Sequence, residues 1–276
     1  MKYIAMIESF YPSLSKTEKK IANYMIEEKG KIIYQTLLEI SKNIHVGEAS
    51  IMRFVRKIGY HGFQDLKLEI AKEDRPQVHE TYEHYIDEVA ANMVHAITNT
   101  KAVLDQKQLN DAIDLIYNAD RIMYYGVGSS GIAANELQNR FMRLGKIGVS
   151  VSDSHFQLMH SSVCGERDVI IAVSLSGYTE DIIDSLKIAK KNNAKIIAIT
   201  NYVLSPVAQL ANSVLLSAGK ENPMDGGSLV AKISQLYIID LLCTGYAIKN
   251  KEIAYELKGR TAQAVTKKSV NKSMDQ

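Results

Sequence analysis

Residues 168–181 read DVIIAVSLSGYTED, an apolar run followed by small hydroxyl residues and two acids. The apolar half predicts a buried strand and the acidic end begins an amphipathic helix, so the SLSGYT segment is the turn between them. Ser174, Ser176 and Thr179 bring three hydroxyls to the start of that helix, and Gly177 permits close backbone approach. A helix cap explains one serine, but this set is better explained as an anion site at a helix N-terminus.

From residue 121 onward the chain alternates short apolar strands with amphipathic helices. This alternation is typical of a parallel sheet covered on both faces. The predicted strands are 121–125, 148–151, 169–173, 195–200 and 213–216. The predicted helices lie near 83–104, 108–118, 130–144, 154–163, 179–192 and 206–211. We therefore expect an α/β domain with a five-stranded parallel sheet.

A second glycine-rich loop, GVGSSG at 126–131, follows the first predicted strand. It matches G-x-G-x-x-G, and Asp153 lies where a dinucleotide fold places an acid for the ribose. That alternative, a dinucleotide-dependent redox sensor, leaves Ser129, Ser130 and the SLSGYT serines unexplained. Because ligands of open α/β sheets bind at the carboxyl ends of the strands, two serine-rich loops there suit one phosphate on a small polyol better.

Length and composition indicate a globular protein of two domains. The chain has 276 residues, of which 46% are hydrophobic and 23% charged. Residues 1–77 contain 13 Lys or Arg and 10 Asp or Glu, whereas the remainder contains 20 and 21. A mildly basic N-terminal part permits nucleic-acid binding without demonstrating it.

The sequence predicts a cytoplasmic protein. The start, MKYIAMIESF, becomes polar too soon for a signal peptide. The apolar segment 229–248 includes Lys232, Gln235 and Asp240, which favours a buried or intersubunit helix over a membrane span. Cys164 and Cys243 are expected to be reduced core residues.

Residues 1–74 predict several short helices. Ser15 and Glu18 form a capping box before one of them, and the apolar stripe of 51–58 marks another. The turn NIHVGE at 43–48 gives the spacing of a helix–turn–helix, whose second helix enters the DNA major groove. A small helical bundle with a solvated basic face is the alternative, and 74–82 is polar enough to be a linker.

The apolar stripe of 48–58 leaves a polar face outside. Candidates for base contacts are Glu48, Ala49, Ser50, Met52 and Arg53, and candidates for phosphate contacts are Arg56 and Lys57.

The segment ISKNIHVGEASIMRFVRKIGYHGFQDLK (40–67) resembles the N-terminal domain of the RpiR family of bacterial transcriptional regulators. The residues that match the family are ASIMRF at 49–54, followed by the pairs Gly59–Tyr60 and Gly62–Phe63. The chain departs from the family at Ser41, His45 and Gly47, where alanine, glycine and serine are usual. Histidine tolerates positive φ and glycine is an acceptable N-cap, so we expect the fold to survive these changes. The resemblance does not identify the DNA sequence of the operator.

Residues 120–250 resemble the SIS (sugar isomerase) domain, a flavodoxin-like fold that binds phosphosugars. The resemblance implies an effector-phosphate site formed by Ser129, Ser130, Ser174, Ser176 and Thr179, with loops shaped by Gly126, Gly128 and Gly177. It also suggests His155, Gln157 and Glu221 as sugar contacts. The alternatives are a polar helix start packed on the sheet edge for the first two and a solvated loop acid for the third.

The two resemblances together imply a DNA-binding regulator of sugar-metabolism genes, expected to be a repressor, with a phosphosugar effector. The alternative is an SIS-type aldose–ketose isomerase, for which Glu221, His155 and His160 are only loosely placed as acid and base. An isomerase has no use for a helix–turn–helix, so we expect no enzymatic activity, no cofactor and no metal. A homodimer or homotetramer is expected on double-stranded operator DNA, with recognition helices about 34 Å apart.

The expected organisation has four parts. Residues 1–75 form the helix–turn–helix domain, 76–82 the linker and 83–250 the SIS domain. The polar tail 251–276 is expected to be disordered.

Overall fold

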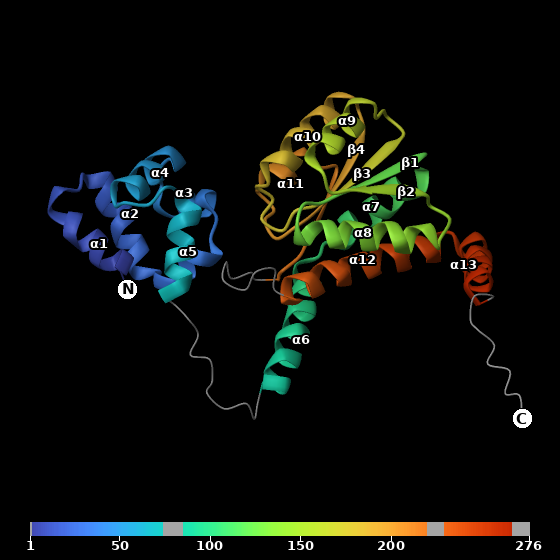
Figure 1. Ribbon diagram of the computed structural model, residues 1–276, viewed down its shortest axis with the longest axis horizontal. Coiled ribbons are helices and arrows are strands. Elements are labelled where there is room, and N and C mark those ends of the chain that lie inside the picture. The colour runs from blue at the N-terminus through green and yellow to red at the C-terminus, as the bar shows by residue number, and fades with distance from the viewer. Residues whose placement is uncertain (1, 74–84, 220–228, 267–276) are drawn as a thin grey trace, which may run out of the picture. The chain divides into compact units, whose positions relative to one another are not determined.

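The computed structural model describes residues 2–73, 85–219 and 229–266 (Figure 1). They form two compact units that divide within helix α6 (Tyr85–Val103), between Ala91 and Asn92. Each unit has its own hydrophobic core. The expected linker at 76–82 lies outside the described residues.

The N-terminal unit is helical, as predicted. Its elements are α1 (Lys2–Phe10), the 3₁₀ turn η1 (Tyr11–Ser13), α2 (Lys16–Glu27), the 3₁₀ helix η2 (Lys29–Tyr34), α3 (Leu37–Ile44), α4 (Glu48–Lys57) and α5 (Phe63–Glu73). The capping box before α2 is confirmed, since the Glu18 amide donates to Ser15 Oγ at 3.3 Å and the Ser15 amide to Glu18 Oε2 at 2.7 Å. The core of the unit is filled mainly by isoleucine and aromatic side chains from all five α-helices.

The C-terminal unit is the predicted α/β domain. The five strands are β1 (Arg121–Tyr125), β2 (Gly148–Val151), β3 (Asp168–Val173), β4 (Lys195–Thr200) and β5 (Ser213–Leu216). All four pairings are parallel, and the strand order is β2-β1-β3-β4-β5. This is the flavodoxin-like order expected from the resemblance.

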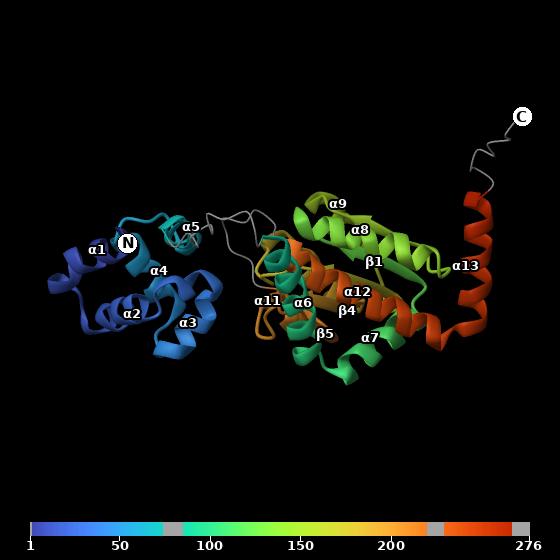
Figure 2. The same cartoon turned by 90° about the horizontal axis from the view of Figure 1, so that it is seen from below.

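Helices cover both faces of this sheet (Figures 1 and 2). Successive side chains of each strand point to opposite faces, and both faces carry buried apolar residues. One face packs against α7 (Gln106–Asn118), α8 (Ser129–Met142) and α12 (Leu229–Lys249). The other packs against α10 (Glu180–Lys191) and α11 (Pro206–Leu210), with α9 (Ser154–Ser162) beside α10.

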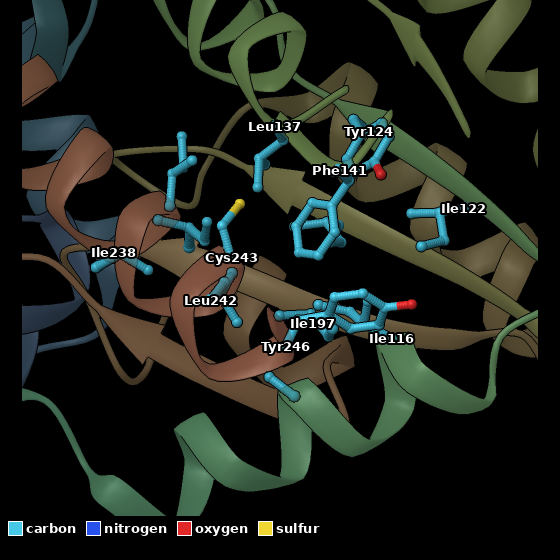
Figure 3. Close-up of a cluster of buried hydrophobic side chains, with 14 of the residues drawn as sticks. Ile116, Ile122, Tyr124, Leu137, Phe141, Ile197, Ile238, Leu242, Cys243 and Tyr246 are labelled. Atoms are coloured by element: carbon cyan, nitrogen blue, oxygen red, sulfur yellow. The ribbon is translucent and has the colours of Figure 1, made fainter. Parts of the chain in front are cut away.

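Helix α12 lies between α7 and α8 in Figure 2. Figure 3 shows its apolar side chains meeting those of α8 and the sheet. The ring centroids of Tyr246 and Phe141 are 5.6 Å apart in an edge-to-face contact. Although α12 is long and apolar enough to cross a membrane, it packs here as a core helix. Cys243 on α12 and Cys164 are buried and unpaired, as expected for core residues.

The expectation of a disordered tail at 251–276 is wrong for most of that segment. Residues Lys251–Thr266 form helix α13, which is rich in residues of high helix propensity. Ala254 is buried in the core of the C-terminal unit, and Leu257 packs against Gly145. Residues 267–276 lie outside the described parts of the chain.

Candidate functional site

The turn between α3 and α4 has the geometry of a helix–turn–helix. His45 ends α3 in the left-handed conformation, with φ of 53°, and the Val46 amide donates to the Ser41 carbonyl at 3.1 Å. Gly47 caps α4 without a side-chain hydrogen bond. The histidine therefore adopts the positive φ that the usual glycine of this position would supply.

Helix α4 buries its apolar stripe and exposes the predicted basic side. Ile51, Phe54 and Val55 are fully buried. Arg53 and Arg56 are exposed, and Arg53 Nη2 donates to Ser50 Oγ at 3.2 Å. Ala49 is exposed, whereas Glu48 and Ser50 are half-buried. The outer surface of α4 thus presents two exposed guanidinium groups, one near its middle and one near its end.

Two predicted DNA contacts already have partners within the unit: Met52 is half-buried, and Lys57, although exposed, has an ionic partner. Met52 is half-buried against the core of the N-terminal unit and packs near Gly62. The Lys57 ammonium lies 2.9 Å from Glu18 Oε1 on α2. The Ser15 amide, together with Lys57, lowers the pKa of Glu18 to about 2, so the ion pair persists at neutral pH. These packing contacts favour Met52 and Lys57 as residues that hold α4 in place.

The two serine-rich loops lie side by side at the carboxyl edge of the sheet. Their strands, β1 and β3, are direct neighbours, and Tyr125 pairs with Ala172 at their last register position. The GVGSSG loop begins directly after β1 and leads into α8. The SLSGYT loop begins directly after β3 and leads into α10. The N-termini of two helices therefore meet at one place, where positive dipole ends favour an anion.

The hydroxyls of the SLSGYT loop have hydrogen-bond partners within the loop itself. Ser174 is buried, and its Oγ lies 3.1 Å from Thr179 Oγ1. Thr179 is the N-cap residue of α10, yet its side chain makes no capping hydrogen bond. Ser176 is exposed and its Oγ accepts from the Tyr178 amide at 3.2 Å. Because Thr179 pairs with Ser174 instead of capping α10, the first turn of this helix keeps amide donors for a ligand.

Three glycines shape the two loops. Gly177 has φ of 67°, and a Cβ there would lie 2.2 Å from Ser205 Oγ. A Cβ on Gly126 would lie 2.5 Å from the Ser130 carbonyl oxygen. Gly128 has φ of 56° and directly precedes α8. A side chain at Gly177 would displace Ser205, one at Gly126 would displace the backbone of its own loop, and one at Gly128 would be strained by the positive φ.

Asn201 connects the SLSGYT loop to the segment after β5. Its amide donates to the Leu175 carbonyl at 2.9 Å, and its side chain donates to the Gly219 carbonyl and accepts from Ser217 Oγ. The Ala218 amide in turn donates to Thr100 Oγ1 on α6 at 3.1 Å. The loop therefore has a hydrogen-bonded connection to α6.

Two residues of α12 join the site that the sequence reasoning did not assign to it. The Lys232 ammonium donates to the Ser129 carbonyl oxygen, and Gln235 Nε2 donates to Ser130 Oγ at 3.4 Å. Their spacing of three residues places both on one face of α12. No local pattern signals these contacts, because more than 100 residues separate α12 from the loop.

The three predicted sugar contacts have different outcomes. His155 is exposed in the first turn of α9, which follows β2 at the same edge of the sheet. Gln157 is completely buried; its Nε2 donates to the Val151 carbonyl at 2.7 Å, and its Oε1 has no hydrogen-bond partner within the described parts of the chain. Glu221 lies outside the described residues. Within the described ranges, no group of three or more His, Cys, Asp or Glu side chains is arranged to hold a metal ion.

Comparison with known proteins matches both units to domain families. Residues 1–77 match the helix-turn-helix domain of the rpiR family, and residues 115–245 match the SIS domain. The chain is 34% identical over 277 residues to an uncharacterized HTH-type transcriptional regulator of Haemophilus influenzae, covering 96% of each chain. It is 27% identical to the HTH-type transcriptional regulator HexR of Escherichia coli, covering 90% of this chain and 89% of HexR.

A solved structure extends the likeness to the whole chain. The NanR protein of Vibrio vulnificus, complexed with ManNAc-6P, is similar with a TM-score of 0.88 and 27% identity, covering 98% of this chain and 100% of NanR. These relatives favour a regulator over an isomerase. The chain belongs to the RpiR family of helix–turn–helix transcriptional regulators with a C-terminal SIS domain.

Proposed function

We propose that this regulator binds a phosphorylated sugar at the carboxyl edge of its sheet and that the bound sugar changes its affinity for operator DNA. The observation that carries the proposal is the meeting of two hydroxyl-rich loops, each at a helix N-terminus, on neighbouring strands. The phosphate would be held by Ser130, Ser174, Ser176 and Thr179, with amide donors of α8 and α10.

The Lys232 ammonium adds a positive charge beside the GVGSSG loop, which suits a phosphate dianion. The sugar would extend towards His155, the exposed candidate on α9. Because the similar protein NanR is complexed with ManNAc-6P, amino-sugar 6-phosphates are the first ligands to test. The SIS domain would act here as a sensor without turnover, as the regulator names of its relatives suggest.

On the DNA side, Arg53 and the first turn of α4 would contact base edges, and Arg56 would contact phosphate. A cytoplasmic homodimer acting as a repressor would place two such helices on a palindromic operator. The protein would have one arrangement that binds operator DNA and one that does not. The sugar phosphate can change operator affinity only if its own affinity differs between these two arrangements.

A pair of variants tests the two roles separately. Combined Ser174→Ala and Ser176→Ala substitutions should lower the affinity for N-acetylmannosamine 6-phosphate by about tenfold or more, because hydrogen bonds to a charged group are lost. Operator binding should remain unchanged. Arg53→Ala should show the opposite pattern, since it removes a base contact worth about 1–3 kcal/mol.

The measurements are calorimetric titration with the sugar phosphate and fluorescence anisotropy with a DNA duplex selected by the wild-type protein from a random library. A double serine variant that retains full sugar affinity and response would show that these loops are not the effector site. Loss of both activities in Arg53→Ala would show that the assignment of α4 is wrong, provided that thermal unfolding is unchanged.

A further inference from the structure

Gln235 contacts the effector site from a distant part of the chain. It lies on α12, 105 residues from Ser130, and its side-chain amide donates to the Ser130 hydroxyl at 3.4 Å. Gln235 is only 3% exposed, so this side chain is held inside the unit and is not a mobile surface group. Lys232, one turn earlier, contacts the Ser129 carbonyl and fixes α12 against the same loop.

The chemistry of the two groups determines which one is the donor in this hydrogen bond. A glutamine Nε2 group can only donate, so Ser130 Oγ must accept in this bond. A hydroxyl has one proton, and with its oxygen engaged by Gln235 that proton is available to another acceptor. At the N-terminus of α8, the acceptor that fits is an anion.

The hydroxyl pair on the other loop lacks this constraint. Either Ser174 or Thr179 can be the donor in their 3.1 Å contact, so the pair can adapt to the ligand. Within the described parts of the chain, Ser130 is the one hydroxyl of the two loops that accepts from a side-chain amide.

We propose that Gln235 is a positioning residue of the effector site, which directs the Ser130 proton towards the phosphate and thereby raises affinity for it. This inference rests on the proposed phosphosugar site. It assigns Gln235 an effect on affinity through Ser130, with no contact of its own to the ligand.

Gln235→Glu tests this proposal directly, because it keeps the shape of the side chain and reverses the direction of its hydrogen bond with Ser130. An ionised carboxylate accepts the Ser130 proton and repels phosphate, whereas a protonated carboxyl can still donate. The ratio of variant to wild-type Kd for N-acetylmannosamine 6-phosphate should therefore rise from near one at about pH 5 to about tenfold or more at about pH 8. Measuring both proteins at each pH cancels the ionisation of the phosphate itself. Because the carboxylate also repels phosphate directly, a double-mutant cycle is needed to separate that repulsion from the orientation of the Ser130 hydroxyl.

A double-mutant cycle tests whether Gln235 acts through Ser130. Gln235→Leu should weaken binding by about threefold to tenfold in the wild-type background and by much less in Ser130→Ala, where no hydroxyl remains to be oriented. Equal losses in both backgrounds would overturn the proposal. Gln64→Glu, on an exposed position of α5, is the control for added negative charge and should leave Kd unchanged. Unfolding temperature, measured for each variant, identifies any that fail to fold.

Failure of this inference is distinguishable from failure of the proposed function. Two results would refute the phosphate site itself, and this inference with it. In the first, the double serine variant binds both N-acetylmannosamine 6-phosphate and inorganic phosphate as tightly as the wild-type protein does. In the second, neither protein binds either ligand. If only the serine variant loses binding and Gln235→Glu matches wild type across the pH range, Gln235 alone is wrongly assigned.

Discussion

At the residue scale, His45 sets the path of the chain between α3 and α4. Its φ of 53° and ψ of 48° lie in the left-handed region, which costs residues with a Cβ about 1–2 kcal/mol relative to the right-handed one. Histidine is exposed here and tolerates this conformation better than bulky residues. The backbone geometry of the turn is therefore kept by a residue that is not optimal for it.

His45→Gly should stabilise the N-terminal unit by about 0.5 kcal/mol. The relief of left-handed strain exceeds the entropy that glycine adds to the unfolded chain, about 0.4–1 kcal/mol. Native-state hydrogen exchange of the α3 and α4 amides measures this unit alone. His45→Ala is the matched control, because it removes the imidazole but keeps Cβ and should give no gain. Equal stabilisation by alanine would rule out strain as the cause.

At the element scale, an ion pair joins β1 and β3 at the edge opposite the effector loops. Arg121 donates from Nε to Asp168 Oδ1 at 2.8 Å and from Nη2 to Oδ2 at 2.6 Å. Asp168 also accepts from the Gly165 amide at 2.6 Å. The Asp168 side chain is 5% exposed whereas that of Arg121 is 60% exposed, so solvent screens one partner.

Asp168→Asn should lower the free energy of unfolding of the C-terminal unit by about 1–2 kcal/mol at pH 7. The hydrogen bonds from Arg121 hold the pKa of Asp168 below its ordinary value. A depressed folded-state pKa stabilises the fold above the unfolded pKa, and this contribution is lost as pH falls through the folded pKa. The difference in urea denaturation should therefore shrink as pH falls from about 5 towards 3.

Asp184→Asn provides the comparison for this carboxylate. Asp184 pairs with Lys187 on the surface of α10, where both side chains are more than half exposed. Its replacement should change the free energy of unfolding by about 0.5 kcal/mol or less. An equal effect of the two substitutions would show that burial of Asp168 adds nothing.

At the scale of the whole molecule, the candidate DNA helix and the candidate effector site belong to different compact units. The SLSGYT loop has a continuous set of hydrogen bonds to α6 through Asn201 and the residues after β5. The division between the units falls within α6. The SLSGYT loop is therefore connected by hydrogen bonds to the helix within which the two units divide.

Thermodynamic linkage makes a quantitative prediction about this connection. If N-acetylmannosamine 6-phosphate changes operator affinity by a given factor, saturating operator DNA must change the affinity for the sugar phosphate by the same factor, usually about 5- to 150-fold. Calorimetric titration of the sugar phosphate with and without the selected duplex measures this factor. An operator response accompanied by identical sugar affinities in the two titrations would exclude allosteric coupling between these sites.

Much of the fold and part of the site follow from the sequence alone. The strands, the two loops and the helix–turn–helix are set by local patterns: alternating or periodic apolar residues, caps, and glycines where φ must be positive. The parallel order of β1 and β3 then places Ser130 and Ser174 on the same edge. These features depend on neighbours within a few residues, which is why they can be read directly.

Only the tertiary structure decided which side chains are free and which distant segments meet. By sequence, Met52, Lys57 and Gln157 are polar-face or motif residues, but in the structure Met52 packs against the core, Lys57 pairs with Glu18, and Gln157 is buried and donates to the Val151 carbonyl. Gln235 reaches the GVGSSG loop because α12 packs along α8, and the tail helix α13 contacts the C-terminal unit through the buried Ala254. Such contacts depend on how whole helices pack on the sheet, and that arrangement is not encoded in any single stretch of the chain.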